Sequence, residues 1–387
     1  MSKIVAVGIL LLLAFKGAAP SVAQVLPKSE RHELLRMNDA KFKDWLSRWE
    51  RNILSENAMR YCNSEMGEEL GWKMSPFQSG FYYGYLATGN ILLVDRLLAC
   101  TDAWIKRGVK GPDGYLGWPK VGAAGSKVDH LDDLYADSMV GEAMALAPVV
   151  LMAAEIRRTP LLEEKYGSKA EDYIKLAEQI FEKWDTRGAW RETDSGGMVT
   201  VELPLGIDQK AEKWTGEYER RYSQAVGFSH QDNKANLIAN WLLAMSDATA
   251  KSIYRERAEK WFRVMKSRMK LKRDGTYEIW NYWEPAGAWD YKSNGLPKHW
   301  IGVHPNAGYY DIDVEGIVSA YKHGLVFDRD DINRLVATAL VEKRYWTALV
   351  PFDETIQKQF EETLDPSSWA GLSRAPRYLA IQLRKAP

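Results

Sequence analysis

The sequence lacks the short motifs that would directly indicate several common enzyme chemistries. It contains no glycine-rich phosphate loop, no His-Glu-x-x-His helix, no Cys-x-x-Cys pair and no Gly-x-Ser-x-Gly elbow. These absences disfavour nucleotide chemistry, zinc proteolysis and α/β-hydrolase chemistry. No cofactor is expected.

The chain also lacks a net charge, because 52 lysines and arginines balance 52 aspartates and glutamates. A protein that neutralises nucleic-acid phosphates normally carries a basic excess, so nucleic acid is not an expected partner. The apolar share of 46% and the charged share of 27% are typical of a soluble globular chain.

Long apolar runs are absent beyond the N-terminus. Residues 1–3 carry a positive charge, residues 4–15 are apolar, and residues 17–23 are small and end in Ser-Val-Ala. This pattern predicts a secretory signal peptide at residues 1–23. An uncleaved anchor is the alternative, but a spanning helix needs about 20 apolar residues. We therefore expect one catalytic domain at residues 24–387, periplasmic or secreted, with no membrane insertion after cleavage.

Cysteine is scarce, since Cys62 and Cys100 are the only two in the sequence. In an oxidising compartment they are candidates for one disulfide. Two buried free thiols are an equal alternative, because the sequence does not place the two Cβ atoms within bonding reach.

Aromatic residues, in contrast, are abundant, with 16 tryptophans and 19 tyrosines. Many recur at spacings of three and four, as Phe42, Trp45 and Trp49 do, which indicates amphipathic helices. Strand-like alternation is limited to residues 198–203 and 277–282. The pattern predicts an all-α fold with minor β pieces. The predicted helices are residues 39–53, 80–88, 91–107, 132–158, 169–184, 233–246, 251–269, 314–324, 332–346 and 369–383.

Two kinds of helical segment alternate along the chain. Segments rich in small residues open after polar and aromatic clusters, and the segments between them are amphipathic and highly charged. An (α/α)n toroid of helical hairpins would produce this alternation, because its inner helices are covered on both sides. A non-repeating helical bundle is the alternative. The first kind comprises residues 77–85, 129–141, 228–236 and 305–316, and the second residues 169–183, 250–272 and 330–343.

Residues 108–127, 186–227 and 273–305 show little helix signal. Loops of this length are usually functional or disordered, and these are too apolar for disorder. We expect them to form the walls of a cleft. Their tryptophans are Trp118, Trp190, Trp214, Trp280, Trp283, Trp289 and Trp300.

The strongest local signal is the segment 228–236, Phe-Ser-His-Gln-Asp-Asn-Lys-Ala-Asn. Ser229 and Asp232 resemble a capping box, which predicts a helix that begins at His230. His230 would then lie in an exposed first turn and share a face with Asn233. An imidazole beside amide donors suits proton abstraction next to a carboxylate, whereas a capped helix start with a solvated histidine is the structural alternative.

A second dense segment, residues 299–316, contains two histidines, Asn306, Tyr309, Tyr310 and several carboxylates. Its turn residues place these polar groups on a loop and a first turn, with the apolar helix resuming at Val314. A metal site is conceivable from His299, His304 and Asp311, although the spacing fits no ligand template, and no metal is predicted.

Two further segments hold candidate ligands. In residues 129–139, the first acids suit a helix N-terminus, while Asp137 lies deeper and is a candidate acid, base or sugar-hydroxyl ligand. In residues 78–85, Tyr82 is a candidate for a cleft wall, although core packing is the commoner fate of such aromatic side chains.

An exported chain of helical hairpins with His, Asn, Tyr, Arg and Trp where inner helices begin resembles the bacterial α/α-toroid polysaccharide lyases, which include alginate and glucuronan lyases. The chain departs from the adjacent Asn-His pair of alginate lyases, because Ser229 precedes His230. The resemblance implies β-elimination from an acidic polysaccharide. It implies His230 as base, Asn233 as carboxylate ligand, Tyr309 or Tyr310 as acid, added positive charge from Arg220, Arg221 or His304, and substrate binding by Asp137, Tyr82, Asn306, Trp283 and Trp300.

Two other functions stay open. An inverting glycoside hydrolase on the same toroid would use two carboxylates about 6.5–9.5 Å apart, with Asp137, Glu284, Asp311 and Asp313 as candidates. A non-catalytic periplasmic glycan-binding protein would need the tryptophans alone. The sequence predicts neither the particular uronate nor the oligomeric state.

Overall fold

The computed structural model describes residues 40–111, 113–121, 135–201, 206–207, 227–344 and 346–383. Within these ranges the chain forms twelve α-helices, and its seven strands are only two or three residues long. The all-α prediction is therefore confirmed. The expected signal peptide, together with Arg220 and Arg221, lies outside the described residues.

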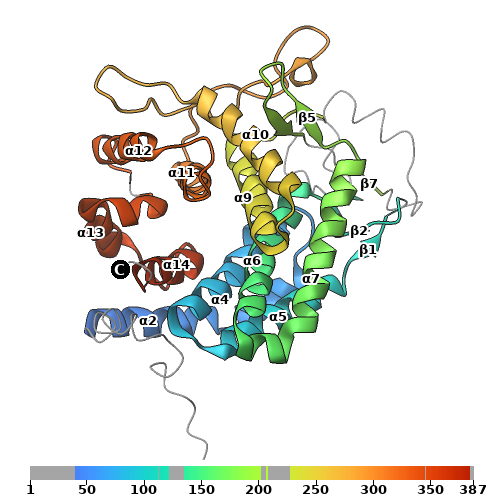
Figure 1. The fold of residues 1–387 in the computed structure, drawn as a ribbon, viewed down its shortest axis with the longest axis vertical. Coiled ribbons are helices and arrows are strands. Elements are labelled where there is room, and N and C mark those ends of the chain that lie inside the picture. Colours follow the sequence, from blue (N-terminus) through green and yellow to red (C-terminus); the bar gives the residue numbers. More distant parts are fainter. Residues whose placement is uncertain are drawn as a thin grey trace, which may run out of the picture.

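The α-helices carry almost all of the secondary structure (Figure 1). Their bounds are α2 Ala40–Ile53, α3 Glu56–Ser64, α4 Ser75–Thr88, α5 Ile91–Ile105, α6 Met139–Arg158, α7 Pro160–Thr186, α9 Asp232–Thr249, α10 Ser252–Arg268, α11 Ala307–Lys322, α12 Arg329–Val341, α13 Glu354–Thr363 and α14 Gly371–Leu383. A π-helical turn, η4 Leu70–Met74, precedes α4, and two 3-10 helices, η6 Ala288–Asp290 and η7 Thr347–Phe352, lie in the second half.

The strands form three small antiparallel sheets. Strands β1 (Val109–Lys110) and β2 (Leu116–Gly117) pair, as do β5 (Trp190–Glu192) and β6 (Met198–Thr200). In the third sheet, β4 (Tyr135–Ala136) lies between β3 (Lys120–Val121) and β7 (Gly206–Ile207). The predicted strand at 277–282 is wrong. Tyr277 makes an isolated bridge to Leu271 there, and no strand spans residues 277–282.

Five helices, α4, α6, α9, α11 and α14, are called the inner helices below. Each of α4, α6 and α9 packs against the next, and α14 returns to pack against α4. Helices α11 and α14 are linked through η7 and through ion pairs of Arg374 with Asp311 and of Arg377 with Glu315. Helices α5, α7 and α10 each pack against the inner helix that precedes them, and α7 and α10 are rich in charged residues.

The beginning and end of the described chain are tied together. The indole N–H of Trp49 in α2 donates to the carbonyl oxygen of Leu372 in α14 at 3.0 Å, and Trp49 is fully buried. Arg48 lies 3.3 Å from Asp365, which precedes α14. The packing of the first helices therefore depends on the last one.

Helix α6 is a long and strongly apolar inner helix. It is long and apolar enough to cross a membrane by length and composition, but 83% of its apolar window is buried inside the protein. Its packing is that of a core helix. It begins at Met139 rather than at the predicted residue 132, because the Ser138 hydroxyl accepts from the Gly141 N–H and residues 135–136 belong to β4.

The loop tryptophans correct the prediction of an aromatic cleft wall. Trp118, Trp280 and Trp283 are buried in the core, because each indole N–H has a buried acceptor on a neighbouring segment. Trp190 and Trp289 are partly buried, and Trp214 lies outside the described residues. Among the described loop tryptophans, Trp300 is the one that is largely exposed, at 46%.

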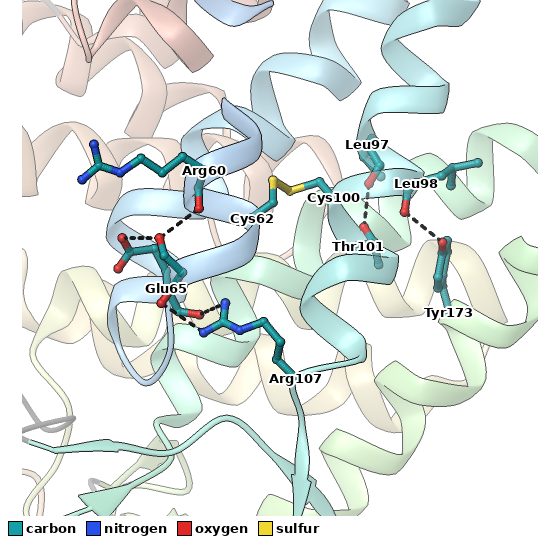
Figure 2. The surroundings of a disulfide bond; sticks show 10 residues. Arg60, Cys62, Glu65, Leu97, Leu98, Cys100, Thr101, Arg107 and Tyr173 are labelled. Atoms are coloured by element: carbon teal, nitrogen blue, oxygen red, sulfur yellow. Dashed lines mark hydrogen bonds between the residues drawn. A yellow bond between two sulfur atoms is a disulfide. The ribbon is translucent and has the colours of Figure 1, made fainter. Parts of the chain in front are cut away.

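Cys62 and Cys100 form a disulfide between α3 and α5 (Figure 2). Beside it, the guanidinium of Arg107 donates to the carbonyl oxygens of Ser64 and Glu65 at the end of α3. These carbonyls lack helical partners, so a cation there satisfies them and opposes the helix dipole. The bridge and Arg107 both fix α3 against α5.

Candidate functional site

Five aromatic side chains gather where α9 and α11 begin, and we call them the histidine–tyrosine cluster: Tyr282, His299, Trp300, His304 and Tyr309. The ring of Tyr282 contacts each of the other four rings. Its centroid lies 4.7 Å from that of His304, 5.4 Å from Tyr309, 5.8 Å from Trp300 and 6.0 Å from His299. The exposed indole of Trp300 stacks on Tyr282, so the cluster reaches the surface.

Backbone hydrogen bonds fix the cluster to the start of α9. The N–H of Asp232 donates to the carbonyl oxygen of Tyr282 at 3.1 Å, and the N–H of Tyr282 donates to that of Gly302 at 2.7 Å. The indole N–H of Trp283 donates to the carbonyl oxygen of Ser229 at 2.7 Å. The segment 282–302 thus has a defined position although it contains only a single 3-10 turn.

A buried carboxylate provides a second attachment for the same segment. Asp290 accepts from both the N–H and the hydroxyl of Ser229, at 2.6 and 2.8 Å, and from the N–H of Ala286 at 2.7 Å. Ser229 is therefore not the helix cap that the sequence predicted. Helix α9 begins at Asp232, two residues after the predicted start at His230, and Gln231 occupies the N-cap position.

The charge of Lys234, in the first turn of α9, acts on His299 and Tyr282 of the cluster. Its ammonium group pairs with both carboxylate oxygens of Glu68, at 2.9 and 3.0 Å. Glu68 also accepts from the indole of Trp72 at 2.8 Å, and the ring of Trp72 lies 6.3 Å from that of Tyr309. Glu68 and Trp72, which lie just before and within η4, therefore connect Lys234 with Tyr309 of the cluster.

A glycine allows this segment to approach α6. A Cβ atom at Gly141 would overlap the carbonyl oxygen of Gly67 and lie 2.9 Å from the Cα atom of Glu68. Only hydrogen fits between the two backbones. Gly141 is thus the residue that lets Glu68 reach Lys234.

Burial and charge affect the proton affinities in the cluster. Burial lowers the pKa of His299, and the nearby positive charge of Lys234 and the ring of His304 lower it further, against a hydrogen bond to the Trp300 carbonyl that raises it. Burial also raises the pKa of Tyr282, which keeps its hydroxyl protonated. At neutral pH the cluster therefore contains a neutral His299 and a neutral Tyr282.

His230 does not lie where the sequence placed it. It precedes α9 rather than occupying its first turn, and its side chain is 2% exposed instead of facing a cleft. Its Nδ1 atom lies 2.9 Å from the hydroxyl of Thr200, and its N–H donates to the Thr200 carbonyl. The physical reason is the bridge between Val201 and Ser229, which draws the chain into a strand-like contact before the helix begins.

Asn233 lies in the first turn of α9, as predicted, and is 1% exposed. Neither its amide nitrogen nor its amide oxygen has a hydrogen-bond partner among the described residues. A buried amide without partners is costly, so Asn233 is a candidate for binding a ligand group.

The two neighbouring tyrosines differ sharply. Tyr309 is half-buried in the cluster, and its ring centroid lies 4.7 Å from that of His304. Tyr310 is 1% exposed, and its hydroxyl donates to the carbonyl oxygen of Trp280 at 3.1 Å and accepts the N–H of His304 at 2.8 Å. The Tyr310 hydroxyl is thus already used to hold the backbone at His304.

A buried acid pair lies close to Tyr310. Asp313 accepts from the amide of Asn236 at 2.8 Å and from the indole of Trp280 at 2.9 Å. Asp232 pairs with Arg268. Burial, together with the charge of Asp232, raises the pKa of Asp313 to about 8, and burial raises that of Asp232 to about 6. Asp313 thus holds Asn236 and Trp280, and Asp232 holds Arg268.

Asp137 and Tyr82 are buried outside the cluster. Asp137 pairs with Arg187 at 2.9 Å and with the fully buried Lys183 at 3.1 Å, and these charges lower its pKa against the effect of burial. Tyr82 is buried in the core, with its ring 5.0 Å from that of Tyr83.

The remaining predicted ligands lie in the second segment. Asn306 caps α11 by accepting from the N–H of Gly308, so the helix begins at Ala307 and carries the two tyrosines on its first turn. Asp311, considered as a metal ligand, is held by Arg374 at 2.6 Å and by the N–H of Thr347. In the part of the chain that the structure describes, no group of three His, Cys, Asp or Glu residues could hold a metal ion.

The sequence did not single out Tyr282, Lys234, Glu68 or Trp72. Lys234 follows Asn233 directly, and an aromatic residue inside a long loop was a weak signal for Tyr282. Glu68 and Trp72 come from a part of the sequence far from the other members, so only the fold brings them near. No known family model, curated protein or solved structure matches this chain.

Proposed function

We propose that this chain is an exported polysaccharide lyase that cleaves a uronic-acid-containing polysaccharide by β-elimination. The observation that supports it best is the histidine–tyrosine cluster beside Lys234. This reaction needs a cation or amide to bind the uronate carboxylate, a base for the C5 proton and an acid for the departing oxygen. The cluster and the first turn of α9 hold all three kinds of group.

We also propose that the inner helices form the inner ring of an (α/α)n toroid. The contact of α14 with α4 supports a closed circuit, and the outer position of charged helices fits it. In such a ring the inner helices start at one end, where the cluster lies. Substrate would bind across that end.

Each group has a role in this proposal. Lys234 and the amide of Asn233 bind the substrate carboxylate, because one is cationic and the other has no partner among the described residues. Tyr309 donates a proton to the departing oxygen, since the Tyr310 hydroxyl is engaged by Trp280 and His304. Trp300 offers an exposed aromatic face to a sugar ring.

The carboxylates favour elimination over glycoside hydrolysis. Asp137 and Asp311 are already in ion pairs, and Asp313 is buried with hydrogen bonds to both oxygens. Glu284 accepts from Asn281 at 2.6 Å. Hydrolysis needs an accessible acid and an accessible base, and these four residues supply neither readily.

Activity on a panel of polysaccharides tests the proposal. The mature chain is incubated with alginate, glucuronan, pectate and neutral glucans, and ultraviolet absorbance of unsaturated uronate is followed together with reducing ends. We expect both signals to rise for at least one uronan and for no neutral glucan. Reducing ends without absorbance would indicate a hydrolase, and a retained glycan without either signal would indicate a binding protein.

A further inference from the structure

The two histidines of the cluster are held in opposite tautomers. The Nδ1 atom of His299 lies 3.2 Å from the carbonyl oxygen of Trp300. A carbonyl oxygen only accepts, so Nδ1 carries the proton and the Nε2 atom of the neutral ring has a free lone pair. The Nδ1 atom of His304 instead accepts the N–H of Asn306 at 2.9 Å. In the neutral His304 ring the proton is therefore on Nε2.

Both rings lie against Tyr282, and Trp300 lies beside each of them at about equal distance, 6.0 Å from His299 and 5.9 Å from His304. Within the described residues no hydrogen bond occupies the Nε2 atom of either ring. One histidine thus offers a proton acceptor and the other a proton donor in the same aromatic cluster.

The surroundings keep His299 ready to accept a proton. Its ring packs against Phe228 and Trp283 as well as Tyr282, at centroid distances of 5.8, 5.5 and 6.0 Å. The charged and titratable groups that act on it are Lys234 from α9 and His304 from its own loop, and both lower its pKa. A base that stays neutral near pH 7 suits proton abstraction.

We propose that His299 is the general base of this site and that the Nε2–H group of His304 donates a hydrogen bond to the substrate carboxylate. This proposal rests on the lyase function proposed above and replaces the base that the sequence implied. His230 is buried against Thr200, whereas His299 belongs to the cluster that contains Tyr309 and the exposed Trp300.

The elimination then balances as follows. The C5–H bond of the uronate breaks and its proton forms an N–H bond with Nε2 of His299. The electron pair becomes the C4–C5 double bond while the C4–O4 bond breaks, and O4 takes the hydroxyl proton of Tyr309. The imidazolium of His299 afterwards returns one proton through water to the tyrosinate, which restores both residues.

Three matched variants of the full-length mature protein test the base: His299→Gln, His230→Gln and His323→Gln. His323 ends α11 about 20 Å along the helix from Tyr309 and pairs with Asp247, so it controls for loss of a histidine elsewhere. For His299→Gln we expect kcat to fall about 10²- to 10⁴-fold on the uronan that the wild type cleaves, with KM changed less than threefold. We also expect the acidic limb of the wild-type pH profile to disappear in this variant, whereas His323→Gln keeps the wild-type rate and profile.

A second measurement is made on the wild-type protein and needs neither enzymatic activity nor a folded variant. Nitrogen-15 chemical shifts of the wild-type imidazoles report the tautomers, and we expect Nδ1–H for His299 and Nε2–H for His304. The opposite tautomer at His299 would overturn the proposal. So would an active wild type in which His299→Gln keeps more than a third of kcat, or in which only His230→Gln is inactive. A wild type that eliminates no uronan would overturn the lyase function and this base with it.

Discussion

The ammonium group of Lys234 lies 2.9 Å from the carboxylate of Glu68, although 166 residues separate the two in the chain. The pair places one positive and one negative charge beside the cluster, since Lys234 lies at the start of α9 and Glu68 binds Trp72, whose ring lies against Tyr309. Replacing Lys234 should weaken the binding of an acidic substrate, whereas replacing Glu68 should strengthen it.

Lys234→Met is expected to raise KM for the cleaved uronan at least tenfold, because a charge-assisted hydrogen bond to a carboxylate contributes about 1.5–3 kcal/mol. Glu68→Gln keeps the shape of the site but removes the competing carboxylate, so KM should fall. Lys251→Met, which breaks an exposed pair with Glu178, serves as control. Steady-state kinetics at two salt concentrations measures the effect, and equal KM values for the two variants would contradict it.

Tyr309→Phe and Tyr310→Phe form a second matched pair. The first should reduce kcat by at least 10²-fold with little change in melting temperature, because it removes a proton donor that has no structural bond in the described part of the chain. The second should mainly reduce stability, by about 1–3 kcal/mol, because it leaves the Trp280 carbonyl and the His304 N–H without their partner. Kinetics and thermal unfolding on both variants test this division, which fails if Tyr310→Phe loses more activity than Tyr309→Phe.

How far the sequence predicted the fold is seen at α11. The apolar stripe correctly predicted a helix here. Its predicted start at Val314 was seven residues too late, because Pro305 and the polar residues that follow it are typical of a loop, whereas the helix begins at Ala307. The Asn306 cap was visible in the sequence, yet its effect was outweighed by the number of polar residues after it. Helices α3 and α13 were missed because both are short.

The site was predicted only in part, for a physical reason. Tyr309, His304 and Trp300 come from one dense segment and could be grouped by sequence alone. Glu68 reaches Lys234 because α6 has no side chain at Gly141, and a pattern along one helix carries no information on what packs across it. The sequence placed His230 wrongly because Ser229 and Asp232 resemble a capping box. In the structure, Ser229 instead binds Asp290, which lies 61 residues further along the chain.

Gly141→Ala is expected to destabilise the protein by about 1–3 kcal/mol and to weaken substrate binding, because the new methyl group meets the Gly67 carbonyl. Gly167→Ala is the control, since Gly167 lies within α7 and its nearest neighbour is the movable, exposed side chain of Glu163. There the same change should stabilise by about 0.5–1 kcal/mol. Denaturant unfolding measures both, and equal signs would contradict the packing argument.

The disulfide should contribute about 4 kcal/mol to stability, from the loss of chain entropy in a loop of 38 residues. Replacing both Cys62 and Cys100 by serine should lower the free energy of unfolding by about that amount. The measurement is denaturant unfolding of the double variant beside the native and the reduced wild type. A native wild type that reacts with a thiol reagent without reductant would show that the bridge is not formed in solution.

Asp313 makes stability depend on pH. Its folded pKa of about 8 lies above the ordinary value of 3.8, so the folded state holds a proton that the unfolded chain has lost. Its contribution is therefore greatest below pH 3.8 and is lost as pH rises to about 8. In Asp313→Asn the decline in melting temperature between pH 6 and 9 should be shallower than in the wild type. Parallel curves would show that Asp313 is already ionised at pH 6.

The bond from Trp49 to the carbonyl of Leu372 joins segments that are synthesised 323 residues apart. The surface of α4 that α14 covers therefore stays open until synthesis has passed residue 371. The order of synthesis delays completion of the core, so a chain that stops short of residue 371 would expose an apolar face to chaperones and proteases.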